Sequence, residues 1–212
     1  MVLEDQEINI KEETRMRVKP LTFNSVEARI QYARDTFPCY IGEELTKYMI
    51  NNGFCSAPAS TKYHGNYEGG LFDHSLAVAS KLIDFTEGLG LKWEKPTSPF
   101  TVGILHDLCK IDNYKKIVTI PASFDFEVFA EDPEEYHYEY NNEPIVKGHG
   151  SKSVIYALRM CPLTDEEVAC ILYHMGAFEH DSASDYANAV ERYPNVLFTQ
   201  TADMYASRVW RV

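Results

Sequence analysis

The chain has 212 residues, of which 45% are apolar and 25% charged, a composition typical of globular proteins that excludes global disorder. This length suffices for one sizeable core, so we expect an N-terminal tail over residues 1–22 and a single domain over 23–212. The formal net charge of -12, without any long run of lysine and arginine, excludes long nucleic acid as the default partner.

The N-terminal segment is charged and lacks the apolar stretch of a signal peptide, and no part of the chain approaches the ~18 apolar residues of a membrane span. We therefore expect a cytoplasmic protein without membrane contacts. Five cysteines, an odd number with no C-x-x-C pair, predict reduced thiols instead of disulfides or a thiolate zinc site. They are Cys39, Cys55, Cys109, Cys161 and Cys170.

Helical periodicity dominates the chain. The predicted helical segments are 26–37, 41–53, 71–85, 100–110, 148–160, 164–178, 184–193 and 195–210. Asn24 and Glu27 have the spacing of a capping box before the first segment. The same spacing recurs at Thr164 and Glu167.

Residues 115–146 have a different pattern, in which aromatic and β-branched residues alternate with polar ones around acidic and proline-containing turns. We expect a β-hairpin or an irregular flap there. The tyrosines of 136–142 would either stack on a nucleotide base or form one half-buried face of a strand. The predicted fold class is therefore all-α, a helical bundle with one small β insertion.

Histidine and aspartate side chains occupy apolar-face or terminal positions of five predicted helices. They are His74, His106, Asp107, His149, His174 and Asp203. Each alone has an ordinary structural explanation, such as a satisfied core histidine. Together they would carry large desolvation costs unless they converge on a shared metal site. One or two ions of Mn, Fe, Co, Ni or Zn suit such ligands better than Mg or Ca.

These residues also carry a family resemblance. The order H…HD…D, here His74, His106-Asp107 and Asp203, resembles the HD-domain superfamily of metal-dependent phosphohydrolases, and HDLCK resembles its HDxxK stretch. The sequence HGNYEGGLFDHS is similar to the first histidine motif of a branch that includes single-strand exoribonucleases. The likeness covers roughly residues 60 to 210 and implies the helical bundle of that family.

Two later motifs, GHGSKSV and ILYHMGAF, resemble the histidine motifs of binuclear HD-domain members. By that likeness, His149 and His174 would ligate a second metal ion that Asp107 bridges to the first. Many binuclear members have two adjacent histidines in the second motif. Here Met175 follows His174, so the resemblance implies a second ion that is weaker or partly lost.

The ligand set indicates hydrolytic chemistry. Two cations about 3.5 to 4 Å apart lower the pKa of a bridging water and hold phosphoryl oxygens for in-line attack, which gives Asp107 a catalytic role. Lys110, one helical turn after Asp107, would neutralise charge on the phosphoryl group or be a solvated lysine. Lys152, in the first turn of a helix, is a second candidate substrate contact, and His64 and Tyr67 are candidate pocket residues.

We therefore expect a phosphomonoesterase or phosphodiesterase that acts on a phosphate ester or anhydride of a nucleotide or short oligonucleotide. Two alternatives stay open: some HD-type proteins with six His/Asp ligands are di-iron oxygenases, and a nucleotide-binding module could keep the site without turnover. A small helical enzyme with an exposed flap is also compatible with a homodimer.

Overall fold

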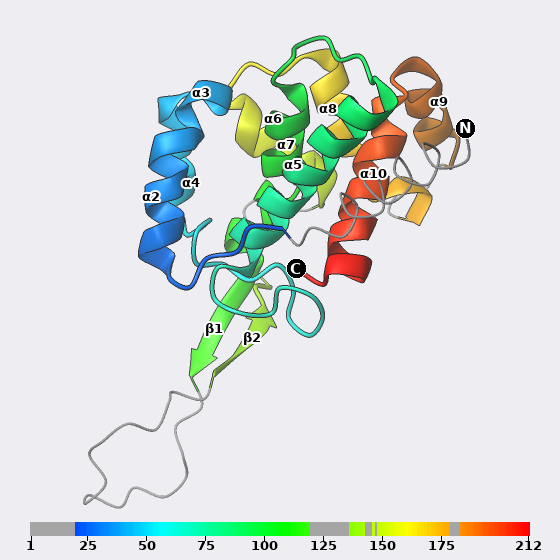
Figure 1. Cartoon of the computed structure of the whole chain (residues 1–212). Coiled ribbons are helices and arrows are strands. Elements are labelled where there is room, and N and C mark those ends of the chain that lie inside the picture. Colours follow the sequence, from blue (N-terminus) through cyan, green and yellow to red (C-terminus); the bar gives the residue numbers. More distant parts are fainter. Residues whose placement is uncertain (1–19, 119–135, 143–145, 147, 179–182) are drawn as a thin grey trace, which may run out of the picture.

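The computed structural model describes residues 20–118, 136–142, 146, 148–178 and 183–212 (Figure 1). Within these ranges the protein is mainly helical, with one two-stranded antiparallel sheet. This confirms the predicted combination of a helical bundle and a small β insertion. Most of the expected N-terminal tail and the middle of the expected flap lie outside the described residues.

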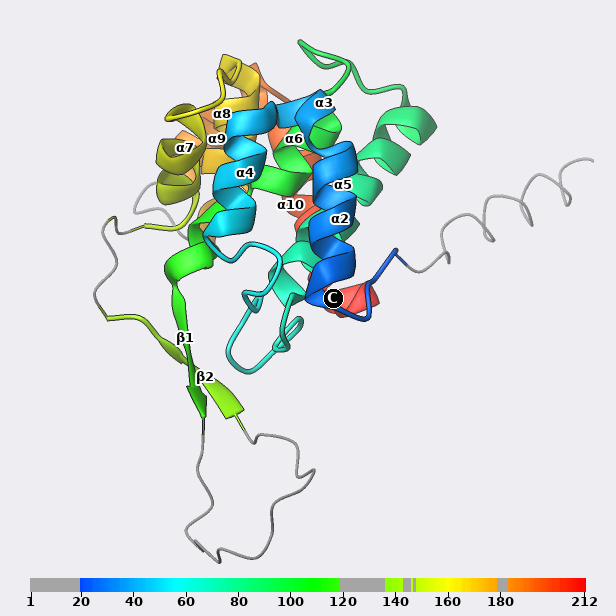
Figure 2. The same ribbon diagram turned by 90° about the vertical axis from the view of Figure 1, so that its left-hand side faces the viewer.

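Three helices form one flank of the bundle: α2 (Val26–Thr36), α3 (Pro38–Ile41) and α4 (Glu43–Asn51). Figure 2 shows them in front of α5 and α6. The N-cap of α2 is Ser25, whose hydroxyl accepts a hydrogen bond from the amide of Ala28 at 3.2 Å. The N-cap is therefore one residue later than predicted, and the capping box predicted at Asn24 and Glu27 is wrong because Ala28 has no polar side chain to complete it.

The centre of the bundle is α5 (Gly70–Leu89), which packs against α6 (Ser98–Leu105) and α10 (Asn195–Tyr205). Every residue of α6 is buried, as expected for a helix surrounded by others. Gly103 brings the two helices into backbone contact, because a Cβ on it would lie 2.3 Å from the Cα of Ala79. This close packing fixes the end of α6 against the middle of α5.

A 3-10 turn, η1 (Leu108–Asp112), follows α6 and leads into strand β1 (Tyr114–Val118), which pairs with β2 (Tyr136–Tyr140). The two strands form a ribbon that projects from the bundle in Figure 1. Tyr138 is buried, whereas Tyr136 and Tyr140 are exposed. Because side chains along a strand alternate between its two faces, these three tyrosines share one face of β2, and only the middle of that face is buried.

The last part of the bundle contains α7 (Gly150–Leu158), α8 (Asp165–Leu172), η2 (Gly176–Phe178) and α9 (Ala183–Arg192). α7 packs on α8, and α8 packs on α10. The capping box predicted at Thr164 and Glu167 is confirmed, since each residue bonds the backbone amide of the other. α10 continues into a π-helical turn over Ala206–Trp210.

The sequence also predicted the absence of membrane spans and of disulfides. Among the described helices, none combines the length and apolar character that a membrane crossing requires. All five cysteines are free thiols, and four of them are buried, with Cys39 the exposed one. The predicted absence of a disulfide framework is thus confirmed.

Replacement of Gly103 by alanine should destabilise the bundle, because the new methyl group meets the backbone of α5. We expect the free energy of unfolding to fall by about 1 to 3 kcal/mol, measured by urea denaturation. Gly88→Ala is the matched control: it lies in α5 with nothing within 4 Å of an added Cβ, and should raise stability by about 0.5 to 1 kcal/mol. Equal stability of the two variants would contradict the close packing of α5 on α6.

Candidate metal centre

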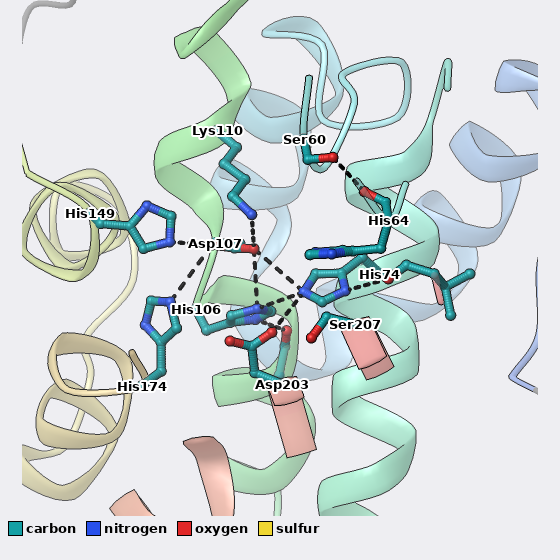
Figure 3. Close-up of polar contacts among 12 residues, drawn as sticks. Ser60, His64, His74, His106, Asp107, Lys110, His149, His174, Asp203 and Ser207 are labelled. Atoms are coloured by element: carbon teal, nitrogen blue, oxygen red, sulfur yellow. Dashed lines mark hydrogen bonds and ion pairs between the residues drawn. The ribbon is translucent and has the colours of Figure 1, made fainter. Parts of the chain in front are cut away.

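The structure brings all six predicted ligands together around the carboxylate of Asp107 (Figure 3). They come from separate elements. His74 lies in α5, His106 and Asp107 follow α6, His149 caps α7, His174 follows α8, and Asp203 lies in α10. Residues spread over about 130 positions of the sequence thus share one buried cluster, as the desolvation argument predicted.

The local backbone at Asp107 differs from the prediction. The sequence predicted one helix over 100–110, but α6 ends at Leu105 and a 3-10 turn begins at Leu108. Asp107 lies between them with φ -104° and ψ 17°, in the bridge region where many active-site residues occur. The break lets His106 and Asp107 point to the same side.

One group of ligand atoms surrounds Oδ2 of Asp107. The Nε2 atoms of His74 and His106 lie 3.3 Å apart, and 3.5 and 3.3 Å from this oxygen. Asp203 Oδ1 lies 3.2 Å from His74 Nε2. Ligands of a transition metal with bonds of about 2.1 Å lie about 3.0 to 3.4 Å apart in octahedral or tetrahedral geometry. This spacing fits one ion.

A second group faces the other oxygen of Asp107. His149 Nε2 lies 2.8 Å and His174 Nε2 3.7 Å from Oδ1. Asp107 therefore turns one carboxylate oxygen toward each group, the arrangement of a bridging ligand. Gly150 permits the approach of the two histidines, because a Cβ on it would lie 2.2 Å from the carbonyl oxygen of Leu172.

The tautomers of three histidines follow from their hydrogen bonds. The Nδ1 atoms of His74, His106 and His174 lie 2.9, 2.8 and 2.7 Å from the carbonyl oxygens of Val212, Gly103 and Ile171. A carbonyl oxygen only accepts, so each Nδ1 carries a proton and the Nε2 of the neutral ring keeps a lone pair. Metal-ligating histidines are held in this way.

Two buried polar atoms in the cluster have no hydrogen-bond partner, namely Nε2 of His174 and Oδ1 of Asp107. Nε2 of His149 lies 2.8 Å from Oδ1 as an ion-pair contact. Burial lowers the pKa of His174, so its ring is neutral and its Nε2 lone pair faces a carboxylate oxygen. Each unsatisfied group would cost about 1 to 3 kcal/mol. A cation between these atoms satisfies both, and the donor set therefore fits a metal ion.

Lys110 lies against the same carboxylate, with Nζ 2.7 Å from Asp107 Oδ2 and only 9% of the residue exposed. Burial disfavours its ammonium, but the negative charge of Asp107 raises the pKa of Lys110 above its usual value. Burial likewise opposes ionisation of Asp107, while Lys110 and His106 hold the pKa of that carboxyl well below its ordinary range. Both groups are charged at neutral pH.

Lys152, a predicted substrate contact, lies outside this cluster of contacts. Its ammonium is fully buried and is bound to Asp112 and, at 2.7 Å, to Asn113 Oδ1. Tyr156 donates to the other oxygen of Asp112 at 2.8 Å. These contacts satisfy Lys152 within the protein and tie α7 to η1.

His64 and Tyr67, the predicted pocket residues, line an open pocket of about 460 Å³. The ring of His64 lies 5.0 Å from that of His74, centroid to centroid. Burial, and then the interactions with His74 and Lys110, lower the pKa of His64 to about 4, so it is neutral at pH 7. The hydroxyl of Tyr67 donates to Asp73 at 3.0 Å.

The sequence prediction missed two contacts of the ligand histidines. Cys109 Sγ lies 3.4 Å from Nδ1 of His149, where the other three histidines meet a carbonyl oxygen. Its position two residues after Asp107 was the available signal. The backbone oxygen of Val212, which orients His74, has no signal in the sequence because it does not depend on the type of side chain.

Comparison of the chain with known protein families, with curated proteins and with solved structures finds no match. The resemblance to HD-domain proteins therefore stays a prediction from the motifs. The case for a metal site rests on the geometry of this chain.

The purified protein should contain a transition metal, and Asp107→Asn should lower that content strongly because Asp107 faces both ligand groups. Element analysis measures the metal directly. Chelation should also reduce the unfolding free energy of the parent protein by about 3 kcal/mol or more, the linkage expected near 100 times the dissociation constant. Asp84→Asn, at a carboxylate 44% exposed and away from the cluster, should keep the metal. Equal metal content in both variants would contradict the assignment.

Lys152→Met tests whether Lys152 serves structure or substrate. Removing the ammonium leaves Asp112 with fewer partners, so the free energy of unfolding should fall by about 1 to 3 kcal/mol. Metal content should be unchanged. Lys47→Met, at an exposed i,i+4 ion pair, should cost at most about 0.5 kcal/mol. If Lys152→Met unfolds with the same free energy as the parent protein, the structural role is wrong and Lys152 stays a candidate substrate contact.

Proposed function

We propose that the protein is a metal-dependent phosphohydrolase of the HD-domain type, which hydrolyses a phosphate ester or anhydride of a nucleotide or short oligonucleotide. The observation that carries the proposal is the pair of ligand groups on the two oxygens of Asp107, where Nε2 of His174 and Oδ1 of Asp107 are buried without a hydrogen bond. The motif order H…HD…H…H…D and the mainly helical fold support it.

The ligand shell is held in place before any substrate arrives. When bound, metal ions supply Lewis acidity, which lowers the pKa of water and polarises a phosphoryl group. The Nδ1–H groups of His74, His106 and His174 donate to backbone carbonyls, so their rings cannot turn away from the centre. Asp107 fixes the relative position of the two ligand groups.

Lys110 supplies a fixed positive charge at the edge of this shell. Its ammonium lies 2.7 Å from Asp107 Oδ2, and burial restricts its motion. Preorganised charge of this kind stabilises negative charge that develops on a phosphoryl group during attack. In this proposal Lys110 acts on the substrate, while Asp107 acts through the ligands that it holds.

Lys110 has a role in the proposed hydrolysis but does not separate it from the oxygenase alternative, which iron content and oxygen uptake distinguish. A buried ammonium beside the bridging carboxylate has a direct use in phosphoryl chemistry, where charge accumulates on oxygen. The low pKa of His64 keeps its ring neutral at pH 7, whereas the raised pKa of Lys110 keeps its ammonium charged there.

A screen of the protein with Mn²⁺ against nucleoside monophosphates, diphosphates, cyclic nucleotides and short oligonucleotides should reveal release of phosphate or nucleotide. Lys110→Met should lower kcat by about 100-fold, close to the loss of one transition-state donor, and should keep the metal. Asp107→Asn should abolish turnover, whereas Lys47→Met should match the parent enzyme.

Failure to release product from every substrate class, in protein shown to hold metal, would overturn the proposed hydrolysis. Iron in the purified protein together with oxygen uptake, and no phosphate release, would point to the oxygenase. Tight nucleotide binding without product would point to a binding module.

A further inference from the structure

The pocket beside His64 contains a second candidate binding site. It has a volume of about 460 Å³ and lies between the loop over 63–67 and the turn after α10. Its lining includes Ser207, Arg208 and Arg211 on the side of the turn. His64 belongs to the lining and packs on the ligand His74, and Figure 3 shows Ser207 next to His74 and Asp203. This arginine pocket therefore adjoins the first ligand group.

The arginine pocket is positively charged. Two guanidinium groups line it and no carboxylate does. Within the described part of the chain, neither Arg208 nor Arg211 has a side-chain hydrogen bond or an ion pair with an acidic residue. Two other pockets are lined by both an arginine and an acidic residue. One contains Arg192 and Asp185, and the other contains Arg34 and Glu43. In a chain of formal charge -12, a pocket with only positive side chains favours an anionic ligand.

The strained backbone of Arg211 places its side chain at the arginine pocket. Arg211 has φ 61° and ψ 37°, and it is the one non-glycine residue with positive φ among the residues described. Such a conformation costs on the order of 1 kcal/mol. The turn directs Val212 into the core, where its carbonyl accepts the bond from His74. The same turn leaves the side chain of Arg211 at the pocket.

We propose that the arginine pocket binds a second phosphate group of the substrate, distinct from the phosphoryl group attacked at the metal centre. This inference rests on the proposed phosphohydrolase function. Guanidinium groups present planar pairs of N–H donors that match phosphate oxygens, and the exposed ring of Tyr63 lies at the same pocket. The preferred substrates are nucleotides with at least two phosphates, in one anhydride chain or on two positions of the sugar.

Equilibrium binding tests the inference independently of turnover. Isothermal titration with metal-loaded protein would compare AMP, ADP and adenosine 3′,5′-bisphosphate, with Lys110→Met in every protein so that hydrolysis does not consume the ligand. At least one ligand with two phosphates should bind about tenfold more tightly than AMP, as expected for charge-assisted contacts at a partly exposed site. Whether ADP or the bisphosphate gains affinity identifies the position of the second phosphate, and either result supports the site.

The double variant Arg208→Ala/Arg211→Gly should reduce this preference to near onefold. Glycine suits the positive φ at position 211, so the turn that holds Val212 should persist, and metal content and affinity for AMP should stay within about twofold of the parent protein. Arg192→Ala removes an exposed arginine from another pocket and should leave the preference unchanged.

Two results would overturn the second-phosphate site: no preference for ligands with two phosphates in the parent protein, or a preference that survives in the double variant. A protein without phosphohydrolase activity would still give a clear answer in these titrations. Failure of the proposed function would instead appear in the product-release screen, so the two failures are distinguishable.

Discussion

The burial of one carboxylate, that of Asp107, sets the requirements for the rest of the structure. A charged group enclosed by protein needs cations or donors. Asp107 meets the ammonium of Lys110 and the ring nitrogens of four histidines from different sides of the bundle, and a cation bound between them would satisfy the carboxylate. Helices α5, α6, α7 and α8 must therefore approach closely at this point, which the backbone contacts at Gly103 and Gly150 permit. Packing and chemistry impose the same geometry here.

Much of the site could be predicted because burial of polar residues is visible in a sequence. His74, on an apolar helix, and Asp203, among apolar neighbours, each needed a partner, and the shared cluster supplies one. The helix break at Asp107 could not be predicted, since local propensity favours a continuous helix and the departure depends on tertiary contacts. The position of Lys152 in the first turn of a helix predicted a substrate contact, and its ion pair with Asp112 could not be predicted because the two lie 40 residues apart in the chain.

The roles of backbone groups and of exposed arginines could not be predicted from the sequence. The carbonyl that orients His74 belongs to Val212, 138 residues further along, and carries no side-chain signature. Arg208 and Arg211 resemble solvated surface arginines until the fold places them in one pocket with His64. A β-hairpin or irregular flap could be predicted at the two-stranded ribbon, because aromatic and β-branched residues alternate with polar ones there.

The bond between His74 and Val212 also concerns the order of events during synthesis. Long-range contacts form late, because the chain between their partners must be complete before they close. His74 gains the acceptor that fixes its tautomer only after residue 212 has left the ribosome. Until the turn over Ala206–Trp210 closes, His74 lacks this orienting bond, so tight metal binding should follow closure of the turn.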